Sequence, residues 1–268
     1  MPENALRGRK YRPLGIIAMA VIAGLGLSGC KTTGGGNAAD PMTTGSLSST
    51  GGQPSLKATT AAAEEWRRDP EDLGKGLAYV RQLELLGQHG QKFAVLKKLI
   101  GYHPRNMGLR AMYARALLKG GRAVQAEGAF RAMLEAGQRD WKTYNGLGSA
   151  LAAQGRFSEA RDQYQLALKA SPGNVKVMNN IALSHILEGN PARAEAMLRR
   201  LLQTPQGRND RRIRQNLALS LGLQGRFKEA RYVASQDLPP EVVEANMAYL
   251  RKMLGGSTDT WEKLRKAG

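Results

Sequence analysis

The sequence predicts an all-α protein built as a superhelix of stacked helical hairpins, and three observations support this. Small residues recur at two fixed offsets in a period of 34 residues, and prolines stand near the ends of two periods. Repeats of about 20 to 50 residues are typical of architectures in which each unit buries its apolar face against its neighbours. Glycines mark the period most clearly, at Gly87, Gly121, Gly155, Gly189 and, after 36 residues, Gly225.

Residues 1–29 have the pattern of an export signal. A short basic stretch precedes an apolar run from Pro13 to Leu27. A transmembrane helix needs about 20 apolar residues, so this run fits a secretory signal better than an uncleaved anchor. The residues Leu27-Ser28-Gly29-Cys30 resemble the bacterial lipobox, and the chain has no other cysteine. This resemblance implies cleavage before Cys30 and lipidation of Cys30, a lipoprotein signal peptide.

The lipid would place the protein in the cell envelope, attached to the membrane through Cys30. Lys31 stands where an aspartate retains enterobacterial lipoproteins in the inner membrane. Its presence favours the outer membrane, with the folded part facing the periplasm. Residues 30–62 are rich in Gly, Ser and Thr and show no apolar periodicity. Such a segment cannot bury enough apolar surface to fold, so we expect a flexible tether.

Residues 63–237 are expected to form the repeat domain. A short lead-in helix is expected within residues 61–72, and repeats start near residues 73, 107, 141, 175 and 211. The two helices of a hairpin approach closely only where both carry small side chains. Position 8 of the repeats holds Val80, Ala114, Gly148, Ala182 and Ala218, and position 20 holds Lys92, Ala126, Ala160, Ala194 and Ala230.

Two departures from the repeat have structural consequences. Lys92 stands where the other repeats have alanine, which predicts a splayed or shifted first hairpin. Two extra residues near Gln203–Asp210 predict a longer loop. Residues 238–268 follow as a capping helix and tail, with a helix from Glu241 to Leu254 that covers the last repeat through one apolar face.

The third repeat resembles a tetratricopeptide repeat most clearly. It carries the matching residues Tyr144, Leu147, Gly148, Leu151, Gly155, Phe157, Ala160, Tyr164, Ala167 and Pro172. The resemblance implies a tetratricopeptide-repeat superhelix of about five helix-turn-helix repeats plus a C-terminal capping helix. It also implies a concave groove for partner proteins, lined by positions 2, 5, 9 and 12 of the first helices.

Cations and amides recur at those groove positions. Cations hold carboxylates and amides can bond an extended peptide backbone, a combination similar in kind to the carboxylate clamp of chaperone-binding repeat domains. The alternative is a solvated polar face on a basic protein. The predicted partner-binding residues are Arg81, Arg115, Lys142, Asn145, Lys176, Asn179, Arg212 and Gln215, with the apolar Leu183 and Leu219.

The sequence favours a binding protein over an enzyme. Its three histidines, His89, His103 and His185, form no ligand set or catalytic constellation with the carboxylates, so we expect neither a metal nor a cofactor. The net charge of +18 indicates an anionic partner. Export makes nucleic acid an unexpected one.

A lipobox, a tether, about five repeats and a cap resemble the TadD-type lipoproteins of the tight-adherence (Flp) pilus assembly system. This resemblance implies a periplasmic scaffold that assists assembly of a pilus or secretion machine, as a pilotin for its secretin. The partners would then be the secretin or another component of that machine. The alternative is an envelope adaptor that regulates cell-wall (peptidoglycan) enzymes.

Overall fold

The computed structural model describes residues 55–255, and these fold into twelve α-helices without a strand. The expected signal peptide, Cys30 and the tail after Gly255 lie outside the described residues. A single helix, α2 (Leu56–Arg68), precedes five hairpins, and α13 (Pro240–Gly255) follows them. The hairpins are α3 (Leu73–Leu85) with α4 (His89–Tyr102), α5 (Met107–Lys119) with α6 (Ala123–Glu135), α7 (Trp141–Ala152) with α8 (Phe157–Ala170), α9 (Val175–Leu187) with α10 (Pro191–Leu202), and α11 (Arg211–Leu223) with α12 (Phe227–Ala234).

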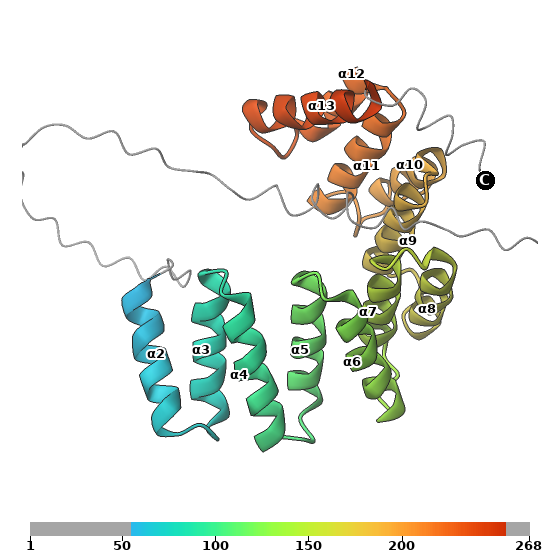
Figure 1. Ribbon diagram of the computed structural model, residues 1–268. Coiled ribbons are helices and arrows are strands. Elements are labelled where there is room, and N and C mark those ends of the chain that lie inside the picture. The colour runs from blue at the N-terminus through green and yellow to red at the C-terminus, as the bar shows by residue number, and fades with distance from the viewer. Residues whose placement is uncertain (1–54, 256–268) are drawn as a thin grey trace, which may run out of the picture.

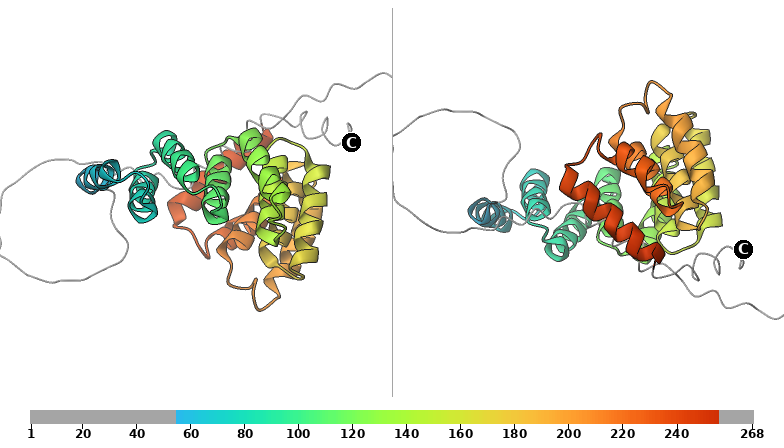
Figure 2. Two further views of the ribbon diagram at one scale, coloured as in Figure 1. Left: turned by 90° about the horizontal axis from the view of Figure 1, so that it is seen from below. Right: turned by 90° about the horizontal axis from the view of Figure 1, so that it is seen from above.

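The hairpins stack in chain order, so that each helix packs against its neighbours in sequence (Figure 1). The first helices α5, α7, α9 and α11 also contact one another in turn. Views from below and from above show the hairpins turning about a common axis (Figure 2). The stack therefore changes direction between α3 and α11, with the first helices of four hairpins side by side.

Each first helix begins at the residue from which its repeat was counted, and an acidic or amide side chain caps it. The Asp72 carboxylate, for example, accepts a hydrogen bond from the Lys75 N–H at 2.7 Å. Such a cap satisfies a backbone donor that the helix cannot. Each turn inside a hairpin has its period glycine at positive φ, a conformation that suits glycine best. The caps are Asp72, Asn106, Asp140, Asn174 and Asp210.

The third hairpin shows why small residues are needed between the helices. A Cβ added to Gly148 would lie 2.6 Å from Cε1 of Tyr164 and 3.0 Å from the Ala160 carbonyl oxygen. Ala160 itself is fully buried. The backbones of α7 and α8 therefore approach as closely as the chain allows.

The first hairpin keeps the register of the others but is more open. The backbones of α3 and α4 come close at fewer places than those of α7 and α8, in agreement with a splayed hairpin, whereas no shift of register occurs. Lys92 lies in this hairpin, where it is 3% exposed and pairs with Glu84. Glu84 also accepts a hydrogen bond from Lys119 of α5 at 2.6 Å.

Neighbouring hairpins are also joined by a repeated ion-pair clamp. Arg156 donates to Glu127 of the preceding hairpin at 2.8 Å, and Arg226 donates to Glu195 of the preceding hairpin at 2.6 Å. Both arginines stand in the same short segment, which reads QGRF in both repeats. The clamp therefore recurs at every second interface, between hairpins two and three and between hairpins four and five.

The predicted boundary between tether and domain was wrong. We expected a flexible segment to residue 62, but α2 begins at Leu56 and ends at Arg68, before Pro70. Ser55 caps the helix by accepting from the Ala58 N–H, and the Thr59 hydroxyl donates back to the Ser55 carbonyl. A local cap and a run of alanines thus outweigh a composition that is typical of a disordered segment.

The C-terminal end follows the predicted pattern closely. α10 ends at Leu202 and α11 starts at Arg211, so the expected longer loop lies between them. α13 buries Val243, Met247 and Leu250 against the last hairpin. No helix among residues 55–255 combines the length and apolar character needed to span a membrane.

Candidate concave binding site

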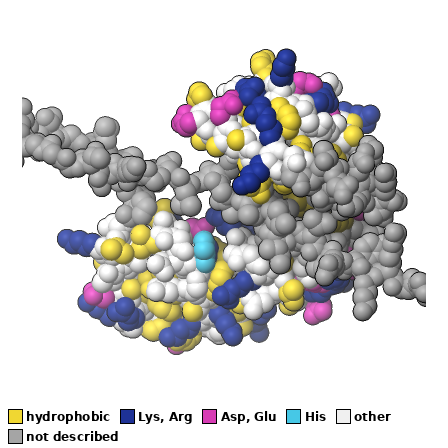
Figure 3. Space-filling model, turned by 45° about the horizontal axis from the view of Figure 1, so that its top comes forward, with side chains coloured by type: hydrophobic (Ala, Val, Ile, Leu, Met, Phe, Trp, Pro, Cys, Tyr) yellow, Lys and Arg dark blue, Asp and Glu magenta, His cyan; other side chains and the backbone are white. Residues whose placement is uncertain are grey.

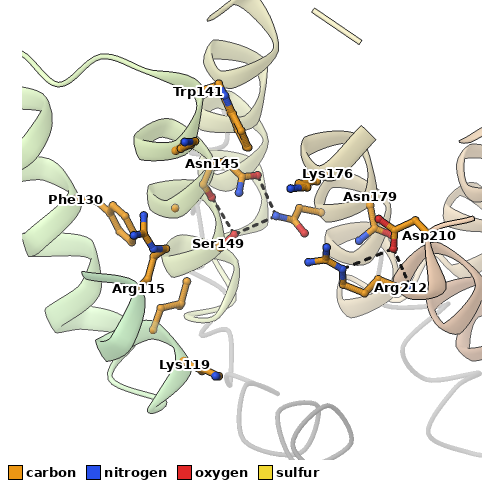
Figure 4. Close-up of a pocket in the computed structure, with 14 residues that line it drawn as sticks. Arg115, Lys119, Phe130, Trp141, Asn145, Ser149, Lys176, Asn179, Asp210 and Arg212 are labelled. Carbon is orange, nitrogen blue, oxygen red and sulfur yellow. Dashed lines mark hydrogen bonds and ion pairs between the residues drawn. The ribbon is translucent and has the colours of Figure 1, made fainter. Parts of the chain in front are cut away.

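A hollow of about 470 Å³ runs along the first helices of hairpins two to five. Its lining side chains come from α5, α7, α9 and the start of α11, with one contribution from α6 (Figure 4). The Phe130 ring of α6 closes its floor, because a Cβ on Gly146 would lie 2.3 Å from that ring. Leu118 and Trp141 add apolar surface at its side. The hollow is therefore a shaped depression with an apolar floor.

Positive charge dominates the rim. The lining holds five cationic side chains and one carboxylate, that of Asp210. Lys119 is paired with Glu84, and Arg212 Nε lies 3.7 Å from Asp210 Oδ1. The other three cations form no ion pair with any carboxylate among residues 55–255. They are Arg115, Lys142 and Lys176, all exposed.

Lys and Arg side chains are also exposed elsewhere on the protein, and Figure 3 shows one face that carries several of them. Many of those cations are compensated. Arg131, for example, pairs with Glu127 at 2.8 Å, and Arg231 pairs with Glu244 at 2.5 Å. The hollow differs because three unpaired cations surround a single depression.

Asparagines link the first helices beneath these cations. The Asn180 amide of α9 donates to Asn145 Oδ1 of α7 at 2.9 Å. One hairpin further on, the Asn216 amide of α11 donates to Asn179 Oδ1 at 2.9 Å. Each acceptor oxygen is thereby occupied, which fixes the orientation of the amide. The NH₂ groups of Asn145 and Asn179 have no protein acceptor in the described part of the chain.

A buried tyrosine stiffens the same region. The Tyr164 hydroxyl donates to Ser149 Oγ at 3.3 Å, and Ser149 Oγ donates to the Asn145 carbonyl at 2.9 Å. Burial raises the pKa of Tyr164 to about 12, so its phenol stays protonated and remains a donor. The position of Asn145 is thus set both by its neighbour on α9 and by α8 behind it.

Comparisons with known proteins identify the fold. Two tetratricopeptide-repeat family models match residues 112–175 and residues 151–219. The chain has the tetratricopeptide-repeat fold. A tetratricopeptide repeat protein from Parabacteroides merdae ATCC 43184 superposes with a TM-score of 0.63 at 13% identity, covering 72% of this chain and 77% of its own. A thermophilic TPR protein from Thermus thermophilus gives 0.56 at 21% identity, covering 66% and 97%.

No significant match was found among curated proteins. Tetratricopeptide repeats are modules for protein–protein interaction, so the fold implies a scaffold that binds proteins or peptides. The tetratricopeptide-repeat fold is typically non-catalytic. No group of three or more His, Cys, Asp and Glu residues between positions 55 and 255 is placed to hold a metal ion.

Six of the ten predicted groove residues meet in the hollow of the tetratricopeptide repeats. The other four lie elsewhere. Arg81 is exposed on α3 and does not line the hollow, and Leu183 and Leu219 pack in part against the second core cluster. Gln215 donates to Asp237 Oδ2 at 3.3 Å, at the end of α12. The six that meet are Arg115, Lys142, Asn145, Lys176, Asn179 and Arg212.

Sequence reasoning missed several residues of the tetratricopeptide-repeat hollow. Asn180, which lines the hollow, and Asn216 stand at position 6 of their repeats, beside the position 5 amides Asn179 and Gln215, and this recurrence could have indicated a ladder. Asp210 was assigned to a loop, although its place before a helix is a capping signal. Phe130 is a buried core residue, and the sequence does not mark it as part of the hollow. The remaining lining residues, Leu118, Lys119, Trp141, Gly146 and Ser149, carry no such pattern.

Proposed function

We propose that this chain is a lipid-anchored scaffold of the bacterial envelope that holds a partner protein in the hollow of its repeats. The observation that carries the proposal is the group of three unpaired cations around a depression shared by several hairpins. Exposed charges without ion-pair partners destabilise the fold little. They can attract and orient a partner protein of opposite charge. A repeat fold supplies such a docking surface.

The lipobox-like residues before Cys30 support the envelope location. A secretory signal followed by a single cysteine fits a lipoprotein, and the Gly/Ser/Thr-rich segment after it provides a tether. We place the anchor in the outer membrane with the repeats in the periplasm. The proposal predicts that Cys30→Ser moves the protein from the membrane fraction to the soluble periplasmic fraction. Retention of the variant in the membrane would contradict lipid anchoring.

The proposed task is assembly of a tight-adherence (Flp) type pilus or secretion machine, with the scaffold acting as a pilotin for the secretin. The order of parts supports this: a lipobox, a tether, five hairpins and a closing helix. A pilotin needs both an anchor and a groove for a segment of its client. The hollow is large enough for several residues of such a segment.

A capture experiment from envelope extracts tests this function. The full chain is compared with a variant carrying Lys142→Glu, Lys176→Glu and Arg212→Glu. A matched control carries Lys97→Glu, Lys169→Glu and Arg200→Glu, at exposed positions on second helices that form no ion pair among the described residues.

The expected result is capture of a secretin or another pilus-assembly component by the wild type and the control but not by the groove variant. Equal capture by all three proteins would contradict the assignment of the hollow. Capture of a peptidoglycan hydrolase instead would replace the pilus role with regulation of cell-wall enzymes.

A further inference from the structure

We propose that the hollow recognises an extended acidic segment within a partner chain, through side-chain carboxylates, and that Asp210 is a built-in anion that weakens this binding. The inference rests on the proposed protein-binding function and specifies its ligand chemistry. It depends on the placement of four groups: the unpaired cations, the oriented amides, the apolar floor and the Asp210 carboxylate.

The cations are spaced as an extended peptide requires. Lys142 and Lys176 occupy the same position in neighbouring hairpins, on helices α7 and α9 that contact each other. Packed helices lie about 8 to 10 Å apart, and an extended chain rises about 3.3 Å per residue. Carboxylates two or three residues apart would therefore match the two lysines. Arg115 on α5 extends the row toward the N-terminal hairpins.

The amides match a peptide backbone in one orientation. The oxygens of Asn145 and Asn179 each accept a hydrogen bond from the next hairpin, whereas their NH₂ groups have no acceptor among residues 55–255. These groups can donate to peptide carbonyls but cannot accept from peptide N–H groups. Together with the cations, these donors favour ligands that supply acceptors and negative charge.

Asp210 limits the site at the end toward α11. Its carboxylate caps α11 by accepting from the Arg212 N–H at 2.9 Å and lies 3.7 Å from the Arg212 guanidinium. Its negative charge thus opposes an acidic ligand and partly neutralises the last cation of the row. Asparagine caps helices as well as aspartate does. Asp210→Asn therefore removes the charge while it keeps the cap.

The assay is fluorescence anisotropy with the full chain purified in detergent. The probe is a fluorescein-labelled decapeptide of alternating Glu and Ser with an amidated C-terminus, and a Gln–Ser decapeptide is the uncharged comparison. We expect binding of the Glu peptide only. Lys142→Gln with Lys176→Gln should weaken it about tenfold, the size expected when two partly exposed ion pairs are lost. The matched control, Lys97→Gln with Lys169→Gln, should stay within about twofold of the wild type.

The Asp210→Asn variant gives a test that misfolding cannot imitate. It should bind the Glu peptide about threefold more tightly, because one repulsive charge is removed from a partly exposed site. Unchanged or weaker binding by a variant with wild-type circular dichroism would overturn the role of Asp210. Binding of the Gln peptide as tightly as the Glu peptide would overturn the acidic ligand.

Two further probes test which chemical group supplies the negative charge of the ligand. A Gln–Ser peptide with a free C-terminal carboxylate that binds as well as the Glu peptide would overturn recognition of internal carboxylates. A single-stranded oligonucleotide of equal charge that binds as tightly would overturn the peptide assignment. Because no pilus component is present, failure here with successful secretin capture would reject this inference and leave the scaffold function standing.

Discussion

The first and third hairpins differ in the side chains that fill the contact between their two helices. In the third, Gly148 and Ala160 leave no room between α7 and α8, and the contact is made by backbone and small side chains. In the first, Lys92 occupies the place of Ala160 and is equally shielded from solvent, with an ion pair to Glu84 at its end. A lysine can thus replace alanine at this position only if the hairpin opens and a carboxylate is supplied.

This difference shows that the position within the repeat determines whether a side chain is buried. It does not determine which partners stabilise the buried side chain. Lys92 lies 5.9 Å from the centre of the Phe93 ring, so an aromatic face assists the carboxylate. Glu84 in turn joins Lys92 to Lys119, which lines the hollow. Glu84, which pairs with the buried lysine, therefore also pairs with one cation of the hollow.

Transferring the lysine to the third hairpin should cause the largest loss of stability. Ala160→Lys would bury a charge without a neighbouring carboxylate, in a place where the close contact at Gly148 leaves no space. The free energy of unfolding should therefore fall by about 4 kcal/mol or more. Urea unfolding followed by circular dichroism measures the effect. Ala170→Lys is the control, because Ala170 is exposed on the same helix. A loss for Ala160→Lys no larger than that of the control would refute close packing of α7 and α8.

Removing the partner of Lys92 should have the next largest effect. Glu84→Gln leaves the lysine buried without a countercharge, and such losses cost about 3 kcal/mol. The same urea experiment should show the midpoint falling. In a Lys92→Met background, Glu84→Gln should cost less than about 1 kcal/mol, since the buried charge is gone. Equal costs in the two backgrounds would show that the pair does not couple.

Replacing the buried lysine itself should change stability at neutral pH by less than about 1 kcal/mol, because apolar replacements of buried ion pairs are often neutral. The acid response should differ more. Hydrogen bonds from Lys119 and Lys92 hold the pKa of Glu84 at about 2, below its ordinary 4.5. A carboxyl with a lowered pKa stabilises the fold above its unfolded pKa, and this stability is lost as the pH falls from about 4.5 toward 2.

Lys92→Met removes one of the two donors, so it should lose less stability than the wild type over that range. Thermal unfolding at pH 5 and at pH 3 measures the difference. An identical acid response in the two proteins would show that Lys119 alone sets the pKa of Glu84.

The sequence predicted the helical hairpins because glycine turns and helix caps act locally. Each first helix starts where the period placed it, since an Asp or Asn cap stands one residue earlier. The start of α2 could not be placed, because Thr59 and Thr60 in its first turns resemble the Thr-containing tether before it. At this point the Ser55 cap indicates a helix start, whereas the composition indicates a flexible segment. The composition was the weaker signal.

The candidate site was only half predictable, for a different reason. The position within the repeat correctly placed Lys142 and Lys176 beside the same hollow. Which first-helix positions face the hollow depends only on how the hairpins stack. Hydrogen-bond partners in different hairpins depend, by contrast, on how far each side chain extends. The hydrogen bond from Gln215 to Asp237 joins α11 to the turn after α12, and no period in the sequence links the two residues.

His185 provides a comparison between buried groups with and without a partner. Position 11 is leucine in the other four repeats, and His185 is 4% exposed with its Nδ1 unsatisfied. Its Nδ1 lies 3.6 Å from Glu188, whose carboxylate is already bound by Arg161. Burial, with the positive charges of Arg193 and Arg161, lowers the pKa of His185 below its ordinary 6.5, although Glu188 opposes the shift.

The unfolded chain therefore takes up a proton on His185 more readily than the folded protein. Stability from the neutral ring is complete above about pH 6.5 and is lost as the pH falls below that value. His185→Leu should stabilise the fold by about 1 kcal/mol at pH 7.5, because an unsatisfied polar atom is removed, and by more at pH 5. Thermal unfolding at the two pH values measures the gain. A gain that is the same at both would mean that the ring titrates normally in the folded protein. The two buried basic side chains thus differ in their partners: Lys92 forms an ion pair with Glu84, whereas Nδ1 of His185 has no hydrogen-bond partner among the described residues.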